Sequence, residues 1–266
     1  MVSFPFAKNI ALFLIAGIEK NYAAGIADVN KKAKKKFSAV QFGFKQDFTK
    51  VDTEAIRMFK REAFTVAQVG SYELQEKLKK AAVDVWEKHG QDFDEFEKQA
   101  RSIMLQYVPL DDQIPSGWLK TNYNTAVNSS YKAAEYNRLQ QYKAIYPAYE
   151  YKTQADDHVR PEHEDLDGLI FKADDPIWDT IWPPNDWYCR CGVDPIDSDE
   201  YDPEELSELD ENERLALENK VAPDFQRNSG QEKSIWGKWL EGKLSDMPED
   251  VVDEIKQNVR EYSKSL

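Results

Sequence analysis

The sequence predicts a mainly α-helical protein in which a small, irregular α+β module follows a helical N-terminal region. Apolar residues recur at helical spacing from about residue 4 to residue 142, whereas short alternating pieces occur only near residues 149–171. A polar, turn-rich segment at residues 153–195 then gathers both cysteines and two of the three histidines. An acidic stretch with helical signals closes the chain. The expected order is therefore a helical part, a loop-rich module that zinc would clasp, and an acidic helical tail.

Length and charge narrow the class of protein. A chain of 266 residues is long enough for one large or two modest domains. It carries 35 basic and 49 acidic side chains, a formal net charge of −14, which argues against a general nucleic-acid binder. Two cysteines do not make a disulfide framework, so the reducing cytoplasm is the simplest compartment.

The first predicted helix covers residues 4–36. Its apolar run at residues 10–18 has nine residues, too few to span a bilayer. A secretory signal is the alternative to an amphipathic helix here, because Lys8 precedes the run and small residues follow it. The helix ends in a basic cluster, which is a solvated face or a weak contact for DNA or an acidic partner. The cluster comprises Lys31, Lys32, Lys34, Lys35 and Lys36.

We expect this basic cluster to add little sequence-independent DNA affinity. The net charge of −14 repels a polyanion, and screening leaves only charges within a Debye length of about 8 Å effective at physiological salt. A fluorescence anisotropy titration with duplex DNA measures this affinity. Tight binding that charge reversal of residues 34–36 abolished would contradict the expectation.

Further helices are predicted between residues 53 and 142. The first begins near Thr53 and ends near Gly70, and Ser71 caps a second that runs to Gly90. A third begins at Asp92, and the last spans residues 117–142. The apolar stripe of the first helix consists of Ile56, Phe59, Ala63 and Val66. Small residues and asparagines in the last helix predict close helix packing and ties to the following loops, with a structural role for Asn122, Asn124 and Asn128.

The composition changes after Pro195. Residues 197–218 hold eleven acidic side chains and a single base, Arg214. Pro203 at a helix start predicts an acidic surface helix over residues 204–217. A final helix is predicted at residues 248–263.

The cysteines and histidines of residues 153–195 predict a metal clasp. In an extended Cys-x-Cys pair both sulfurs point to one side, so Cys189 and Cys191 are the anchors. His163 is the third predicted zinc ligand. His158 is the fourth, ahead of Asp157, with Asp156 also considered. A disulfide between these cysteines would be strained, whereas two unligated buried thiols remain the alternative.

The same segment carries a longer sequence motif, which reads D-D-H-V-R-P-E-H-x-x-L-D-G, then D-P-x-W, then W-P-P-x-x-W-x-C-R-C. Its defining residues are Asp157, Val159, Arg160, Pro161, His163, Leu166, Asp167, Gly168, Asp175, Pro176, Trp178, Pro183, Pro184, Cys189, Arg190 and Cys191. This motif resembles that of the phage Mu F-like minor head protein family, which serves phage head morphogenesis. A T-N-Y-N-T-A helix start and an F-x-x-N-x-G element at residues 225–230 resemble the same family.

This resemblance, which covers about residues 54–195, implies a structural protein and a domain scheme. The chain would be a minor capsid protein, associated with the portal and the prohead interior during assembly and DNA packaging or ejection. It would occupy the host cytoplasm and then the virion, encoded by a phage or a prophage. The scheme has an N-terminal helix and connector (1–50), a Mu F-like domain (51–196, helical to 147) and an acidic extension (197–266). Other branches carry cysteines where this chain has Arg160 and His163, which favours metal binding in those branches.

Two other classes of function are weighed against this one. A zinc-dependent hydrolase would use an open ligand position, with Glu162 or Glu164 as base. No H-E-x-x-H helix supports it, and paired cysteines favour closed structural sites, so we expect no enzyme. The second is a DNA-binding accessory protein of the virion.

If residues 153–195 form a structural clasp, we expect Arg160 to pair through both guanidinium nitrogens with Asp157 or Asp167. Residues 182–184 and Trp187 would then pack over the clasp.

Overall fold

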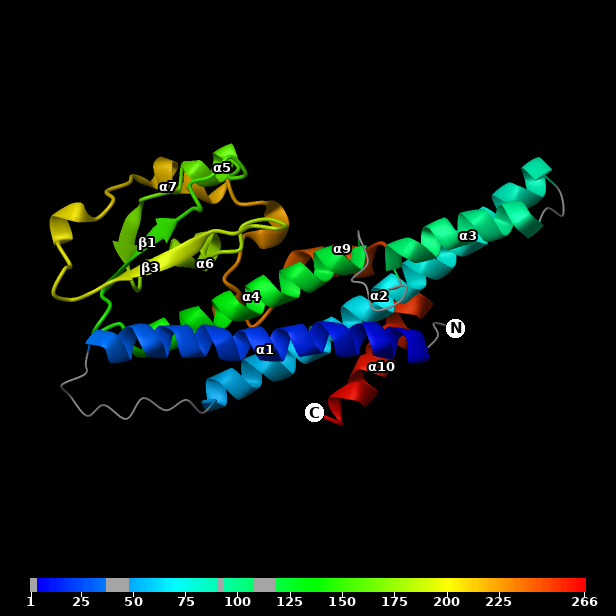
Figure 1. The fold of residues 1–266 in the computed structure, drawn as a ribbon, viewed down its shortest axis with the longest axis horizontal. Coiled ribbons are helices and arrows are strands. Elements are labelled where there is room, and N and C mark those ends of the chain that lie inside the picture. The colour runs from blue at the N-terminus through cyan, green and yellow to red at the C-terminus, as the bar shows by residue number, and fades with distance from the viewer. Residues whose placement is uncertain (1–3, 37–47, 90–92, 108–117) are drawn as a thin grey trace. The chain divides into compact units, whose positions relative to one another are not determined.

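The chain folds into ten α-helices and a three-stranded sheet within the part that the structure, a computed structural model, describes: residues 4–36, 48–89, 93–107 and 118–266 (Figure 1). Their bounds are α1 Phe4–Lys36, α2 Lys50–His89, α3 Phe93–Tyr107, α4 Trp118–Gln141, β1 Ala148–Lys152, α5 Pro161–Glu164, β2 Ile170–Lys172, α6 Trp178–Ile181, β3 Gly192–Ile196, α7 Glu211–Glu218, α8 Ser229–Glu232, α9 Gly237–Ser245 and α10 Glu249–Ser263. Two short 3₁₀ turns lie at Pro203–Glu205 and Pro223–Phe225. The mainly helical class is confirmed.

The predicted helix boundary at Gly70 and Ser71 is wrong, because α2 continues through both residues to His89. The glycine serves packing here. A Cβ at Gly70 would lie 2.5 Å from the ring of Trp118, so only glycine allows that indole to approach the helix. Ser71 is buried inside the helix and caps nothing. Gly90 and Asp92, predicted as the next boundary, fall outside the described residues.

The chain forms two compact units, each assembled from separate segments. Unit 1 comprises Met1–Ala16, Lys60–Asn124 and Gly242–Leu266, and unit 2 comprises Gly17–Phe59 and Thr125–Glu241. Unit 1 contains most of α2 and all of α3 and α10. Phe64 stacks on Tyr262 of α10 with ring centroids 4.5 Å apart. The apolar stripe predicted for residues 56–66 is buried.

The sheet of unit 2 has the order β2-β1-β3, with both pairings antiparallel. The middle strand β1 places Tyr149 opposite Phe171 and Pro195, and Tyr151 opposite Val193. Both tyrosines are fully buried and join Trp178 and Trp182 in the main core cluster of this unit. The motif tryptophans therefore build the core on which the loops rest.

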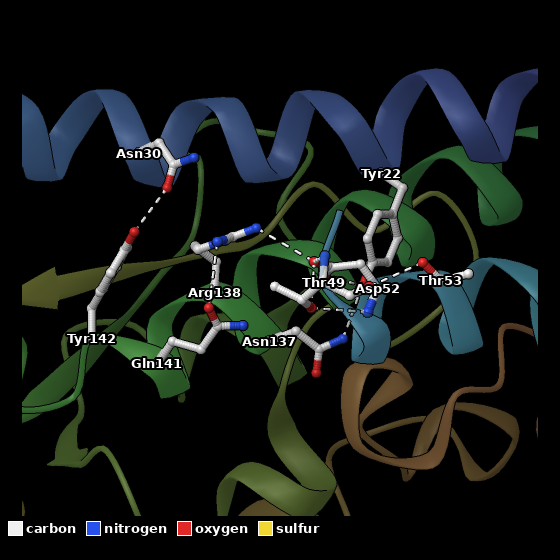
Figure 2. A network of polar contacts seen from close by, with 9 residues as sticks. All are labelled: Tyr22, Asn30, Thr49, Asp52, Thr53, Asn137, Arg138, Gln141 and Tyr142. Carbon is white, nitrogen blue, oxygen red and sulfur yellow. Dashed lines mark hydrogen bonds and ion pairs between the residues drawn. The ribbon is translucent and has the colours of Figure 1, made fainter. Parts of the chain in front are cut away.

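A buried polar network joins α1, the start of α2 and α4 within unit 2 (Figure 2). Asp52 accepts hydrogen bonds from the Tyr22 hydroxyl at 2.9 Å and from the Thr49 N–H and hydroxyl at 2.7 Å each. Arg138 of α4 lies 3.4 Å from the same carboxylate, and the side chains of Asp52 and Arg138 are 1% and 3% exposed. Asn137 donates to the Tyr22 hydroxyl at 3.0 Å. Buried charges of this kind persist only when paired and hydrogen-bonded.

The small residues of α4 allow the close packing that the sequence predicts. A Cβ at Gly25 of α1 would lie 2.5 Å from the Tyr131 carbonyl oxygen of α4, so the two backbones approach closely there. The other small residues on this face of α4 are also buried: Ser129, Ser130, Ala133 and Ala134.

The acidic stretch is not the single predicted helix over residues 204–217. A 3₁₀ turn at Pro203–Glu205 precedes α7, which begins only at Glu211, after a capping box formed by the N-cap Asp210 and Glu213. The one base of the stretch, Arg214, donates to both oxygens of Asp175 at 2.6 and 2.9 Å. This arginine fastens α7 to the D-P-x-W motif.

Replacing Arg214 by glutamine should destabilise the protein at neutral pH by about 1–2 kcal/mol, because a partly buried bidentate ion pair is lost. Burial raises the pKa of Asp175, but the Arg214 hydrogen bonds outweigh it and lower that pKa. Stabilisation by a carboxyl with a depressed pKa is present above its unfolded pKa and vanishes as pH falls through the folded value. Urea unfolding of wild type and Arg214→Gln should therefore converge in acid. Arg101→Gln, which breaks an exposed pair with Glu97, is the control; a pH-independent gap would contradict the prediction.

Residues 221–240 pack onto the same core as the motif segment. Phe225 is buried in the core cluster, and Asn228 donates to the Trp178 carbonyl at 3.0 Å while its oxygen caps α8. A Cβ at Gly230 would lie 2.9 Å from the Ala133 carbonyl of α4. The F-x-x-N-x-G element thus closes unit 2 against α4. In the described part of the chain, no helix combines the length and apolarity needed to cross a membrane.

Candidate metal centre

The turn between β1 and β2 brings His163 into the interior. Arg160 has extended backbone angles before α5, and Pro161 at the first helical position fits there because its missing N–H is not needed. One turn later His163 is buried, whereas Glu162 and Glu164 are exposed. The two cysteines lie just before β3 and are also buried, at 4% and 7% exposure.

His163 Nδ1 lies 3.8 Å from Cys189 Sγ and 3.6 Å from Cys191 Sγ. The three potential ligand atoms all lie within 4.8 Å of one another. They border a small pocket of about 20 Å³, enough for one water-sized species. An imidazole nitrogen and two thiol sulfurs are the donor set that zinc prefers. The residues therefore fit a zinc ion, and three of the four predicted ligands are brought together.

The fourth predicted ligand lies at the rim of the site. His158 is exposed and lines the same small pocket, but it is not part of the buried group of three. Its backbone N–H donates to Asp156 at 3.0 Å. Asp157, the second choice, is exposed as well. His158 as the fourth ligand stays a prediction.

The surroundings shift the pKa values of the two thiols in opposite directions. A hydrogen bond from Cys191, together with bonds from His163 and the Asn185 N–H, lowers the pKa of Cys189 well below its usual value despite burial. The bond to Cys189 and burial raise the pKa of Cys191. A bound dication would favour the loss of the thiol protons, since metal ligands are thiolates.

The prediction that Arg160 forms an ion pair with Asp157 or Asp167 is wrong. Arg160 donates to the Trp187 carbonyl at 2.7 Å and pairs with Asp186 at 3.1 Å, not with Asp157 or Asp167. Asp167 instead accepts from the N–H and hydroxyl of Thr153, at 2.6 and 3.0 Å. Arg160 lies next to the chain's exit from the Pro-Pro turn, which explains its choice of Asp186.

The predicted link between the entry and exit of the loop does exist, but Arg190 makes it. Its guanidinium donates to both oxygens of Asp156, at 2.7 and 2.6 Å. This pair lowers the pKa of Asp156 to about 2. Strand alternation explains the arrangement: the residue between two inward cysteines points outward, where it meets the exposed loop.

Of the two tryptophans predicted to pack over the metal clasp, one is buried and the other lies at the periphery. Trp182 is fully buried, contacts Trp178 and Tyr149, and donates to the Lys132 carbonyl of α4 at 3.0 Å. Trp187 is half-buried and packs edge-on against Phe225, with ring centroids 5.1 Å apart. Both tryptophans thus anchor the segment that leads into Cys189 and Cys191.

Sequence reasoning missed two buried polar residues beside the sulfurs. The Tyr151 hydroxyl accepts a hydrogen bond from Asn185 Nδ2 at 3.0 Å, and both side chains are fully buried. Burial, together with the neighbouring Cys189 and Cys191, raises the pKa of Tyr151. Asn128 of α4 donates to the Cys189 carbonyl at 3.2 Å, as the predicted tie between helix and loop. No periodicity marks these contacts, because they join segments far apart in the chain.

A second pocket lies beside the two cysteines. It is larger, at about 390 Å³, and borders the cysteines from the α4 side, and none of its described lining residues is Asp, Glu or His. Its cations are paired, Lys132 with Glu135 and Arg190 with Asp156. Of the basic cluster, Lys31 and Lys32 are exposed and Lys32 pairs with Asp194 at 3.7 Å. The side chains of Lys34–Lys36 lie outside the described residues.

Comparison with known proteins gives one family and two relatives. Residues 80–194 match the family model described as "Phage Mu protein F like protein", which confirms the resemblance seen in the motif. Protein F of Escherichia phage Mu, whose name assigns it to capsid assembly, is 39% identical over 75 residues, or 28% of this chain and 17% of that protein. The Mu-like prophage FluMu F protein of Haemophilus influenzae is 40% identical over 78 residues, 29% of this chain and 19% of that protein. The match spans less than a fifth of each relative. No solved structure matches the chain.

Proposed function

We propose that this chain, whose residues 80–194 form a Mu F-like segment, is a structural protein of phage head morphogenesis. The observation that carries the proposal is the match of residues 80–194 to the Mu F-like family model, supported by the relative whose name assigns it to capsid assembly and by the packed core of the motif segment. Trp178 and Trp182 lie inside that core, and ion pairs of Arg160 with Asp186 and of Arg190 with Asp156 connect its loops. Such a module offers a rigid surface for other proteins.

We propose further that the chain acts as a minor capsid protein at the portal and in the prohead interior. It would assemble in the host cytoplasm and remain in the virion. The exposed acidic stretch at residues 197–218 is suited to contact with basic surfaces of other head proteins. The hydrolase is less well supported, because none of the described residues lining the larger pocket beside the cysteines is Asp, Glu or His. The DNA-binding accessory is less well supported, because Lys32, one of the two described lysine side chains of the basic cluster, is paired with Asp194.

Fractionation of heads from the encoding phage tests this proposal. Empty and filled heads would be separated on a density gradient and probed for the chain, in wild type and in a strain with a stop codon early in its gene. We expect the chain in heads at low copy number and a loss of filled heads in the mutant. A chain absent from every head fraction, with normal heads in the mutant, would refute the proposal.

Within this function, we propose that zinc is a structural ion of the module. Cys189, Cys191 and His163 would hold it, with His158 as the predicted fourth ligand. Bound zinc would cross-link the α5 turn to the Cys-x-Cys segment just before β3. Elemental analysis of purified protein tests occupancy: no zinc, with two freely titratable thiols in the folded protein, would leave the pair a packing role.

A further inference from the structure

Three carboxamide side chains line the larger pocket of unit 2, and they come from three segments of the chain: Asn21 of α1, Asn128 of α4 and Gln154 of the loop after β1. The nitrogen of each donates to a backbone carbonyl, at 2.9, 3.2 and 3.0 Å respectively. These bonds fix which end of each amide is nitrogen, because a flipped amide would set oxygen against oxygen. The three amide oxygens accept no hydrogen bond from any described residue, so the pocket is rich in free acceptors.

The same pocket has two cationic side chains whose charges are already balanced. Lys132 donates to Glu135 at 2.6 Å, and the two terminal nitrogens of Arg190 donate to Asp156. Within the described residues this leaves N–H groups on Lys132 Nζ and on Arg190 Nε for a further acceptor. The pocket therefore offers both donors and acceptors, and its cations are neutralised from outside the lining.

This combination disfavours charged ligands of either sign. A carboxylate or phosphate would meet three amide oxygens, and an ammonium or guanidinium group would meet the two cations. A carboxamide carries two N–H donors and one acceptor oxygen, so it can satisfy both kinds of lining group without bringing a charge. Val127 and Pro184 form an apolar part of the wall, which suits a short methylene stem behind the amide.

We propose that this pocket binds the carboxamide side chain of a Gln or Asn residue on a partner polypeptide. Asn21, Asn128 and Gln154 accept from its NH₂ group, and Lys132 and Arg190 donate to its oxygen. A side-chain amide fits a hollow better than a backbone amide, which has one N–H and is flanked by chain on both sides. The site adds to the proposed structural role, and it depends neither on a bound ion nor on where the chain lies in the head.

Titration of the isotope-labelled full chain with N-acetylglutamine methylamide, followed by heteronuclear NMR, tests the proposal. The side-chain NH₂ signals of Asn21, Asn128 and Gln154 report on the pocket directly. We expect these signals to shift saturably. The matching glutamate and lysine probes should bind at least about tenfold more weakly, since each leaves a charge poorly compensated and part of the lining unpaired. Shifts that never saturate would overturn the proposal, as would a glutamate or lysine probe that binds as tightly as glutamine.

A pair of matched variants locates the binding. Gln154→Met removes one acceptor from the pocket and should weaken the glutamine probe about threefold to tenfold. Gln140→Met is the control, because Gln140 also ties a loop carbonyl, that of Ala173 at 2.8 Å, but does not line the pocket. Equal binding by Gln154→Met and wild type, or an equal loss in the control, would overturn the proposal. Circular dichroism checks the fold of each variant, and Asn21→Leu, with the same expected loss, replaces Gln154→Met should that variant fail to fold.

Discussion

Replacing Cys191 by serine should lower the melting temperature of the zinc-loaded protein by about 10 °C or more and release the ion. Losing a structural metal is among the few single changes that cost more than about 4 kcal/mol, and about 1 kcal/mol corresponds to 2–4 °C at this size. The reason is local: Cys191 and His163 lie on segments that meet at the pocket. Binding free energy at such a site is folding free energy.

Chelation separates metal loss from simple damage to the core. EDTA should lower the melting temperature of wild type toward that of Cys191→Ser and leave the variant unchanged. Glu162→Gln, an exposed change on the same short helix as His163, is the control and should respond to EDTA as wild type does. An equal EDTA effect in Cys191→Ser would show that the stabilising ion sits elsewhere.

Replacing Arg138 by methionine should destabilise the protein by about 3 kcal/mol, or roughly 6–12 °C in melting temperature. The change leaves Asp52 buried and charged, with only neutral donors around it (Figure 2). Removing one member of a buried pair is costly because the other charge stays without compensation. Calorimetry of the purified variant measures the loss.

A second substitution tests whether charge is the cause. Asp52→Asn neutralises the remaining partner and keeps the hydrogen-bonding shape, so the double variant should recover much of the loss. Arg138 Nε is already buried without a hydrogen-bond partner in the described structure, which limits what the native pair contributes. Lys79→Ala, which breaks an exposed pair with Glu76, should cost less than about 1 kcal/mol. A double variant as unstable as Arg138→Met would point to lost packing.

Sequence reasoning predicted the local features of this fold better than the distant ones. The spacing of Ile56, Phe59 and Ala63 marks a buried helix face because that periodicity is local. The Gly70 boundary failed because Trp118, which requires the glycine, lies 48 positions away along the chain. A glycine that ends a helix and one that admits a ring look alike in sequence.

In the candidate metal site, too, the sequence predicts local geometry but not contacts between distant segments. Alternation in a strand was enough to place Cys189 and Cys191 side by side and Arg190 outward. It could not choose the partner of Arg160, since aspartates flank it on several segments and only the folded turn selects Asp186. Tyr151 carries no signal beyond a strand pattern, because its partners belong to a loop more than 30 residues later.

The division of the chain into interleaved segments bears on how the protein is made. Unit 2 needs Gly17–Phe59 from the start of synthesis and residues up to Glu241 from near its end. Asn228 and Gly230, which close it against Trp178 and α4, leave the ribosome after every helix they contact. The face of α4 that Gly230 covers must therefore stay exposed while about 100 further residues are translated, which at 5–20 residues per second takes roughly 5–20 seconds. During that interval the nascent chain exposes apolar surface that favours capture by a chaperone or by another copy of itself.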